Sequence, residues 1–369
     1  MARRHGRQRL DTAATMTETN SASGLVAAAL VLAIGGPVLA QDRVLAVTSW
    51  GGAYMASQRE VYFKPFTAKT GIVVREAEYD GELPKIKAMV ESGRVSWDIV
   101  DTTMSLAVRG CDQGLWEKLD YSRIGDRAGF VPGGALDCAV GSVIWSTVVA
   151  FDERRFPASG PQPQSIADFF DVVRFPGARA LGKRPRVNLE MALMADGVPP
   201  GDVYRTLSVP EGVERAFRKL STIKPFIKAW WDSGNRPTKL LADGEVVMTT
   251  VLNGRIAYAI GHEKRPFKIM WHGQVWDMDL WAIPKGARRL DLAYEFLRFA
   301  SDPTVMAKQS QHVAYGPAHV EAIALVDPRV LPLLPNAPEN FAHGLQTDAR
   351  FWAARQDELA IQFANWLAR

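Results

Sequence analysis

The sequence predicts an α/β fold in which mostly parallel sheets are flanked by helices. From residue 44 onward, short apolar runs alternate with helical patterns, an order typical of parallel strands joined by helices. The chain has 369 residues, of which 47% are hydrophobic and 23% charged. That length and balance suit two globular domains. We therefore expect two α/β lobes.

The expected elements follow from apolar periodicity and from turn residues. Strand patterns cover 44–48, 72–77, 97–101, 141–151, 244–252 and 276–283. Helical patterns cover 54–69, 83–90, 165–170, 189–194, 212–220, 292–300 and 348–367. Gly71 and Gly93 end the first two helices, because glycine readily adopts the left-handed conformation that closes a helix. The long run at 141–151 is a candidate crossing from one lobe to the other.

The first 40 residues are typical of an export signal. A basic start precedes an apolar stretch at 25–39, and Val38-Leu39-Ala40 fits a cleavage site before Gln41. The apolar stretch is about 15 residues, shorter than the roughly 20 that span a bilayer. We expect cleavage and a periplasmic mature protein, with an uncleaved membrane anchor as the alternative. The net charge of +4 comes partly from this segment, and no basic stripe for nucleic acid is visible elsewhere.

Cys111 and Cys138 are the two cysteines of the chain. In an oxidising compartment an even pair predicts one disulfide. Two free buried thiols are the alternative.

Sequence signatures of catalysis are absent. The chain has no phosphate-binding glycine loop, no G-x-S-x-G elbow and no H-E-x-x-H pair, and its histidines are not at metal-ligand spacing. We expect no catalytic residue, no metal and no cofactor. An enzyme with a dispersed site is the alternative from a different class.

Several segments together resemble the extracellular solute-binding proteins of spermidine/putrescine-type ABC importers. They are SWGGAY (49–54), FTAKTGIVV (66–74), WDIVDTT (97–103), LLADGEVVMTTVLNGR (240–255), WDMDLWAIPKGA (276–287), AYEFLRFASDP (293–303) and VAYGP (313–317). The resemblance implies a two-lobed periplasmic binding protein fold of type II, with the ligand in a cleft between hinged lobes. It also implies a monomer without enzymatic activity that delivers a small polar solute, here a polyamine or related amine, to ABC permease subunits at the inner membrane.

The resemblance gives a division of the chain. Residues 1–40 are the signal peptide, and 41–148 with about 279–320 form the first lobe. Residues 149–278 form the second lobe, and 321–369 form C-terminal helices that pack on the lobes.

Such folds bind ligands at the carboxyl ends of their strands. The candidates at these ends are Trp50, Tyr79, Asp80, Thr102, Thr103, Asp232, Ser233, Asn253, Trp276, Asp277, Asp279 and Tyr315. Asp279 is the expected anchor for an ammonium group, and Trp50 and Tyr315 are the expected aromatic walls. Alternatively, Trp50 plugs the end of the sheet, and Asp279 caps a loop or pairs with an arginine.

Two departures from the polyamine pattern bear on the ligand. Arg184 and Arg186 stand at or near places where polyamine receptors carry acids, and Leu252 replaces the aromatic residue expected before Asn253. If these arginines and Arg255 face the cleft, they repel a polycation by about 1–4 kcal/mol per close pair. The ligand would then carry a carboxylate, as an amino acid derivative or zwitterionic amine does. The alternative is that they point to solvent. Arg186 and Arg255 join the ligand-binding candidates on this basis.

Overall fold

The computed structural model describes residues 43–369, which belong to one compact unit, Gln41–Arg369. The predicted signal peptide at 1–40 lies outside the described residues. Within the described part of the chain, no helix is both long and apolar enough to cross a membrane.

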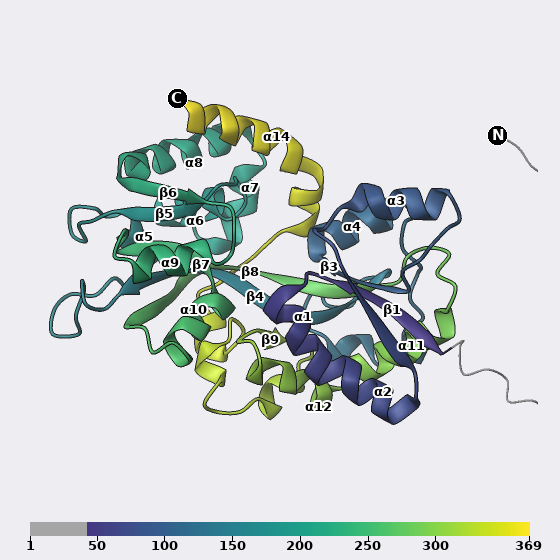
Figure 1. Cartoon of the computed structure of the whole chain (residues 1–369). Helices are drawn as coiled ribbons and strands as arrows, with labels where there is room; N and C mark the ends of the chain where they lie inside the picture. The colour runs from purple at the N-terminus through teal and green to yellow at the C-terminus, as the bar shows by residue number, and fades with distance from the viewer. Residues whose placement is uncertain (1–42) are drawn as a thin grey trace, which may run out of the picture. The chain divides into compact units, whose positions relative to one another are not determined.

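A 10-stranded mixed sheet forms the centre of the unit (Figure 1). Its strands are β1 (Val44–Ser49), β2 (Val73–Glu78), β3 (Ile99–Thr103), β4 (Ala139–Asp152), β5 (Arg179–Gly182), β6 (Ile227–Trp231), β7 (Met248–Leu252), β8 (Phe267–Ala282), β9 (Gly316–Pro317) and β10 (Leu345–Gln346). The order is β2-β1-β3-β8-β4-β7-β5-β6, with β9 beside β4 and β10 beside β8. Each end of the sheet is parallel, whereas the central β4 and β8 run antiparallel to each other and to β7 and β3.

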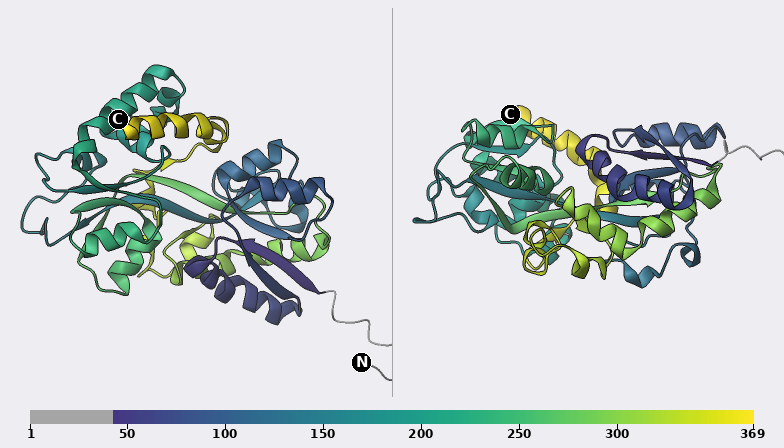
Figure 2. Two further views of the ribbon diagram at one scale, coloured as in Figure 1. Left: turned by 45° about the horizontal axis from the view of Figure 1, so that its top comes forward. Right: turned by 60° about the horizontal axis from the view of Figure 1, so that its bottom comes forward.

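Helices cover the sheet on both faces (Figures 1 and 2). They are α1 (Gly52–Gln58), α2 (Lys64–Thr70), α3 (Leu83–Glu91), α4 (Met104–Asp112), α5 (Ile166–Phe170), α6 (Asn188–Ala195), α7 (Val203–Leu207), α8 (Pro210–Ile223), α9 (Arg236–Ala242), α10 (Asn253–Gly261), α11 (Leu290–Ala300), α12 (Pro303–Met306), α13 (Pro338–Phe341) and α14 (Ala349–Ala368). A π-helical turn, η2 (Arg59–Phe63), joins α1 to α2. The shorter 3-10 turns are Tyr121–Arg123, Arg127–Gly129, Pro200–Asp202, Lys224–Phe226, Ala307–Gln311, Ala322–Leu325 and Leu331–Leu333. This α/β architecture confirms the predicted fold class.

The apolar core separates into packing clusters at the two ends of the sheet. We call the first lobe the part around the cluster that includes Leu45, Ile99 and Phe296. We call the second lobe the part around two further clusters, which include Leu189 and Leu241. Both β4 and β8 contribute buried residues at each end, so these two strands run through both lobes.

The sequence misplaced some elements. The β8 strand begins at Phe267 rather than at 276, because its first six residues mix buried, half-buried and exposed side chains without a continuous apolar run. The β7 strand begins at Met248 rather than at 244, after a turn at Gly244. The short elements β5, β6, α4, α9 and α10 were not predicted, since four to nine residues offer too little periodicity.

A disulfide joins Cys111, near the end of α4, to Cys138, directly before β4. Their Cα atoms are 5.9 Å apart, and the described residues include no free cysteine. The predicted pairing is confirmed, and the alternative of two free thiols is wrong.

Candidate functional site

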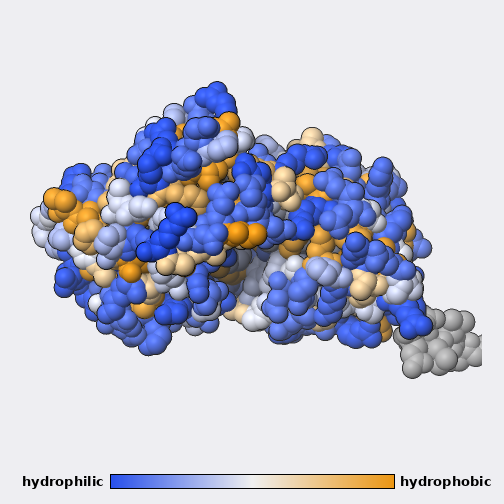
Figure 3. Space-filling view, turned by 90° about the horizontal axis from the view of Figure 1, so that it is seen from above, coloured by the Kyte–Doolittle hydropathy of each residue, from blue (hydrophilic) through white to orange (hydrophobic). Residues whose placement is uncertain are grey.

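A cavity of about 490 Å³ is lined by residues of β3, β4, β7 and β8, of the loops that follow β1 and β5, of the loop before β9, and of the helices α1, α10 and α14. This volume is typical of small-molecule sites. In the space-filling view, the surface dips between the two halves of the molecule (Figure 3). The residues that line the cavity are Trp50, Gly51, Tyr54, Thr103, Trp145, Thr147, Arg184, Pro185, Arg186, Val187, Leu252, Arg255, Asp279, Tyr315, Trp352, Gln356 and Ala360.

Six of the predicted site residues lie in this lining: Trp50, Thr103, Arg186, Arg255, Asp279 and Tyr315. They come from six different elements or their adjoining loops, separated by up to 265 positions in the sequence. The structure therefore brings together strand ends from both lobes, as the position of the sites in this class of sheet predicts.

Asp279 is the buried acid of the cavity. It projects from β8 beside Thr103 of β3 and Val143 of β4. Its Oδ1 accepts a hydrogen bond from Nε1 of Trp145 at 2.9 Å. Burial raises the pKa of Asp279 well above its usual range, and the nearby charge of Asp101 raises it further. A carboxylate in this setting gains most from a cation that enters the cavity.

Asp101 is a second buried acid behind Asp279. Its Oδ2 accepts hydrogen bonds from Ser49 Oγ at 3.1 Å and from Gln58 Nε2. Burial raises the pKa of Asp101 to about 7, although these hydrogen bonds oppose the shift. Within the described residues its Oδ1 has no hydrogen-bond partner. Asp101 and Asp279 are both buried, and the charge of Asp101 raises the pKa of Asp279.

Aromatic rings form the walls beside the acid. Trp50 stacks on Tyr79 with ring centroids 5.0 Å apart, and Tyr54 lies 5.8 Å from Tyr315. Trp50 is half-buried and lines the cavity, so it does not simply plug the end of the sheet. Ring faces at this position suit an ammonium group or its apolar stem.

The opposite wall is positively charged. Arg184, Arg186 and Arg255 all line the cavity from the second lobe. Arg184 is exposed and its guanidinium lies over the ring of Trp231, 5.0 Å from the centroid. Arg186 forms an ion pair with Asp277 and donates to Ser105 Oγ at 3.2 Å.

The loop that carries two of these arginines is held in an unusual conformation. Val187 has a φ of +76°, a value that costs a β-branched residue of the order of 1–3 kcal/mol. The side chain of Asn188 donates to the carbonyl oxygens of Gly182 and Arg184, both at 2.7 Å. These bonds hold the loop against the start of α6 and so orient the guanidinium groups.

Three predicted residues lie directly behind the lining. Tyr79 supports Trp50, and its hydroxyl donates to the carbonyl of Asp101 at 2.6 Å. Asp277 is buried and holds Arg186, while Thr102 is buried in β3.

Two others are committed to internal packing. Asn253 begins α10, and its side chain accepts from the Ser146 N–H at 3.0 Å and donates to the carbonyl of Ala314. Trp276 is buried, with its ring 4.8 Å from that of Phe341. Neither side chain lines the cavity.

Asp80, Asp232 and Ser233 are exposed loop residues outside the lining. Asp80 follows Tyr79 at the end of β2, and the other two follow β6. They were predicted because they follow the carboxyl ends of strands, but that position does not specify which loops turn away from the cavity.

Part of the lining was not predicted from the sequence. Tyr54 lies within the SWGGAY segment, one helical turn after Trp50, and that spacing was an available signal. Trp145 and Thr147 lie in the middle of β4 rather than at a strand end. Trp352 belongs to the C-terminal helix, and no local pattern connects that helix to the cavity.

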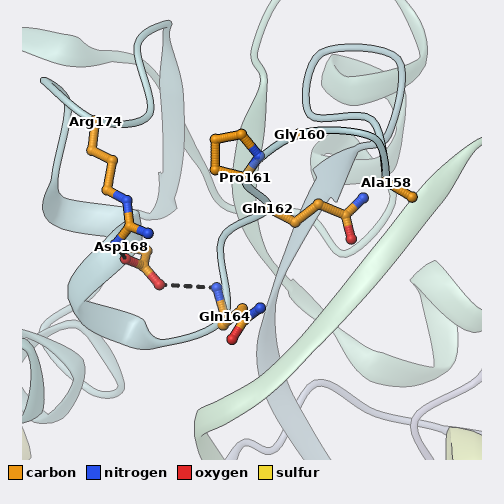
Figure 4. A pocket seen from close by; sticks show the side chains of 7 residues that line it. All are labelled: Ala158, Gly160, Pro161, Gln162, Gln164, Asp168 and Arg174. Carbon is orange, nitrogen blue, oxygen red and sulfur yellow. Dashed lines mark hydrogen bonds and ion pairs between the residues drawn. The ribbon is translucent and has the colours of Figure 1, made fainter.

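A smaller recess of about 300 Å³ lies on the second lobe, between α5 and the loop before it (Figure 4). Asp168 pairs with Arg174 at 3.5 Å and accepts from the Gln164 N–H at 2.9 Å. The polar groups of this recess therefore cap α5.

Among residues 43–369, no group of three or more His, Cys, Asp or Glu side chains is arranged to hold a metal ion.

Comparison with known proteins identifies the class. The family model of the bacterial extracellular solute-binding protein matches residues 61–342. The gamma-aminobutyric acid-binding protein of Pseudomonas aeruginosa is 44% identical over 338 residues, which are 92% of this chain and 95% of that protein. The spermidine/putrescine-binding periplasmic protein of Escherichia coli is 21% identical over 276 residues, 72% of this chain and 76% of that protein.

Solved structures agree. An ABC transporter substrate-binding protein from Bradyrhizobium japonicum has a TM-score of 0.81 at 36% identity, covering 88% of this chain and 99% of that one. A structure of a GABA receptor has a TM-score of 0.78 at 32% identity, covering 88% and 98%.

The fold and the cavity thus define a solute receptor of the periplasmic binding class. The chain belongs to the bacterial extracellular solute-binding protein family. Its relatives are substrate-binding proteins of ABC transporters rather than enzymes, and in bacteria this family implies a periplasmic location. The resemblance inferred from the sequence is confirmed at the level of the family.

Proposed function

We propose that this protein captures a small zwitterionic amino compound, such as gamma-aminobutyric acid (GABA), and delivers it to an ABC permease. One observation carries the proposal: a buried acid, Asp279, forms one wall of the cavity, and three arginines line another. A molecule with an ammonium at one end and a carboxylate at the other would meet an opposite charge at each.

At the ammonium end, Asp279 would accept a charge-assisted hydrogen bond, worth about 1.5–3 kcal/mol. The rings of Trp50 and Tyr315 would add about 0.5–2 kcal/mol through cation–π contact. The hydrogen bond from Trp145 orients the Asp279 carboxylate for this contact.

At the carboxylate end, Arg184 and Arg255 are the available cations. Arg186 already pairs with Asp277, whereas among the described residues neither of the other two forms an ion pair with a carboxylate. A guanidinium binds a carboxylate in a planar, two-pronged geometry that an ammonium cannot provide.

A polyamine, the first expectation from the sequence, fits this cavity less well. It has no anionic end, and each arginine close to it would cost about 1–4 kcal/mol. The relative named for GABA also has about twice the sequence identity to this chain that the relative named for spermidine and putrescine has.

We further propose that the two lobes close on the solute about β4 and β8. The sequence places the lobe boundaries near residues 148 and 279, and the change from one core cluster to the other supports a boundary on β8 a few residues earlier, between Val275 and Trp276. The pairing of β4 with β8 is interrupted between Thr147 and Val149, where the partner residue on β8 jumps from Val275 to Met270. An irregularity in both strands at one level is a natural place for a bend.

Isothermal titration calorimetry of the exported protein tests the ligand class. GABA is expected to bind and putrescine to bind weakly or not at all. Tight binding of putrescine without binding of any carboxylate-bearing amine would overturn the proposal. The solute that co-purifies with the native protein, identified by mass spectrometry, provides an independent check.

A further inference from the structure

The C-terminal helix α14 contacts both lobes. Near its start, Ala349 and Ala353 pack against the first-lobe cluster, and the helix backbone lies close to that of α4. Further along, Leu359 and Phe363 belong to the second-lobe cluster. The helix accordingly runs from beside α4 toward α8 (Figure 1).

Aromatic packing anchors the second half of α14. Phe363 lies 5.8 Å from Trp230, and Trp366 lies 5.7 Å from Phe217, measured between ring centroids. Lys224 Nζ also donates to the carbonyl of Trp366 at 2.8 Å. This end of the helix is thereby fixed to the second lobe.

A buried carboxylate fixes the first half. Oε1 of Glu190, in α6, accepts from Nε1 of Trp352 at 2.7 Å and from the hydroxyl of Tyr204 at 3.0 Å. Glu190 and Trp352 are both fully buried. A hydrogen-bonded pair of this kind sets the rotation of the helix about its own axis, and so decides which side chains face the cavity.

The face so presented is Trp352, Gln356 and Ala360, which all line the cavity. Their spacing of four residues places them one above another on the helix. Trp352 is buried, whereas Gln356 and Ala360 are exposed, so this face forms a wall at the open side of the cavity. Of the three, Gln356 is the long and exposed side chain.

We propose that α14 is a strap across the open side of the cavity and that Gln356 limits the size of the solute accepted there. This inference rests on the proposed function, because it concerns the solute of the same cavity. Gln356 acts as a specificity-determining residue, and Glu190 is a positioning residue that acts through Trp352.

The test compares Gln356→Trp with Gln362→Trp. Gln362 is the matched control, since it is an exposed glutamine of the same helix, bonded to Glu358 and outside the lining. Calorimetry would measure the Kd values of GABA, 5-aminopentanoate and 6-aminohexanoate for each variant and for the wild type.

We expect Gln356→Trp to raise the Kd of the longest ligand that the wild type binds about tenfold more than Gln362→Trp raises it. Gln356→Ala is expected to shift the preference toward longer ligands. If both Gln356 variants follow the wild type across the series, the strap does not select the solute. If the wild type binds none of the three compounds, the proposed function itself fails, which is a distinguishable result.

Discussion

The indole of Trp145 donates a hydrogen bond of 2.9 Å to the carboxylate of Asp279, across the central pair of strands β4 and β8. Both residues line the cavity. The strand pair shared by both lobes therefore also carries and orients the acid of the site, so ligand binding and the proposed lobe movement would act on the same element.

Replacing Asp279 by asparagine is expected to weaken GABA binding by about 10- to 100-fold, because the ammonium loses a charge-assisted bond. The melting temperature of the unliganded protein should not fall, since the change removes a buried acid that burial disfavours in its charged form. Asp80→Asn is the control, as Asp80 is exposed and outside the lining. If calorimetry gave the Asp279→Asn variant the same affinity for GABA as the wild type, Asp279 would not bind the ligand.

Replacing Arg255 by glutamine should weaken the binding of GABA by a similar factor. The binding of putrescine should become no weaker than in the wild type. The reason is that the loss of a cation harms the binding of a carboxylate but relieves repulsion of a diamine. Arg265→Gln, an exposed arginine in the loop before β8, serves as control. Equal loss of both ligands would indicate that Arg255 supports the structure of the cavity rather than its charge.

The pH dependence follows from the raised pKa values of Asp101 and Asp279. The pKa of Asp101 is raised from 3.8 to about 7, so this group holds more of its proton in the folded protein than in the unfolded chain between about pH 4 and 7. The pKa of Asp279 is raised in the same direction by burial and by the charge of Asp101. The contribution of these groups to stability is present at low pH and is lost as the pH rises. The affinity for an ammonium ligand should change in the opposite direction, because deprotonation creates the negative charge that binds it.

This pH dependence can be measured as the Kd of GABA between pH 5 and 8 in the wild type and in Asp101→Asn, which keeps the size of the side chain. The wild-type affinity is expected to rise with pH, and the rise should be smaller in the variant. A Kd that falls by the same factor in both proteins as the pH rises would exclude Asp101 from the effect.

Replacing Cys111 and Cys138 together by serine should lower the free energy of unfolding by roughly 3–4 kcal/mol, the entropy of closing a loop of this length. Urea denaturation measures this loss. Affinity for the ligand should be unchanged, since neither cysteine lines the cavity. A loss of affinity in a variant that is still folded under the assay conditions would show that the disulfide also shapes the site.

Much of the fold could be predicted from the sequence, because the strands and longer helices of the first lobe have clear apolar periods and glycine stops. The β1 strand and α3, for example, lie within one residue of their predicted bounds. The second lobe was harder, since β5 and β6 have only four and five residues. Their strand character depends on pairing with β7 and with each other.

The site was predictable where a residue lies at or near a strand end, as Trp50, Thr103 and Asp279 do. The sequence also raised the question of Arg184, because its charge departed from the polyamine pattern. The contribution of α14 to the cavity could not be predicted from the sequence. Its cavity-facing side is set by the contact of Trp352 with Glu190, 162 positions away, and no short-range pattern encodes such a contact.

The paired strands β4 and β8 have one more consequence. They are hydrogen-bonded to each other from Ala139 opposite Ala282 to Asp152 opposite Phe267. Paired strands bend across the flat side of the sheet more easily than they slide past each other, because sliding would break the hydrogen bonds between them. We expect the lobes to open and close about a single axis. Asp279 and the arginines would then return to the same relative positions each time a solute binds.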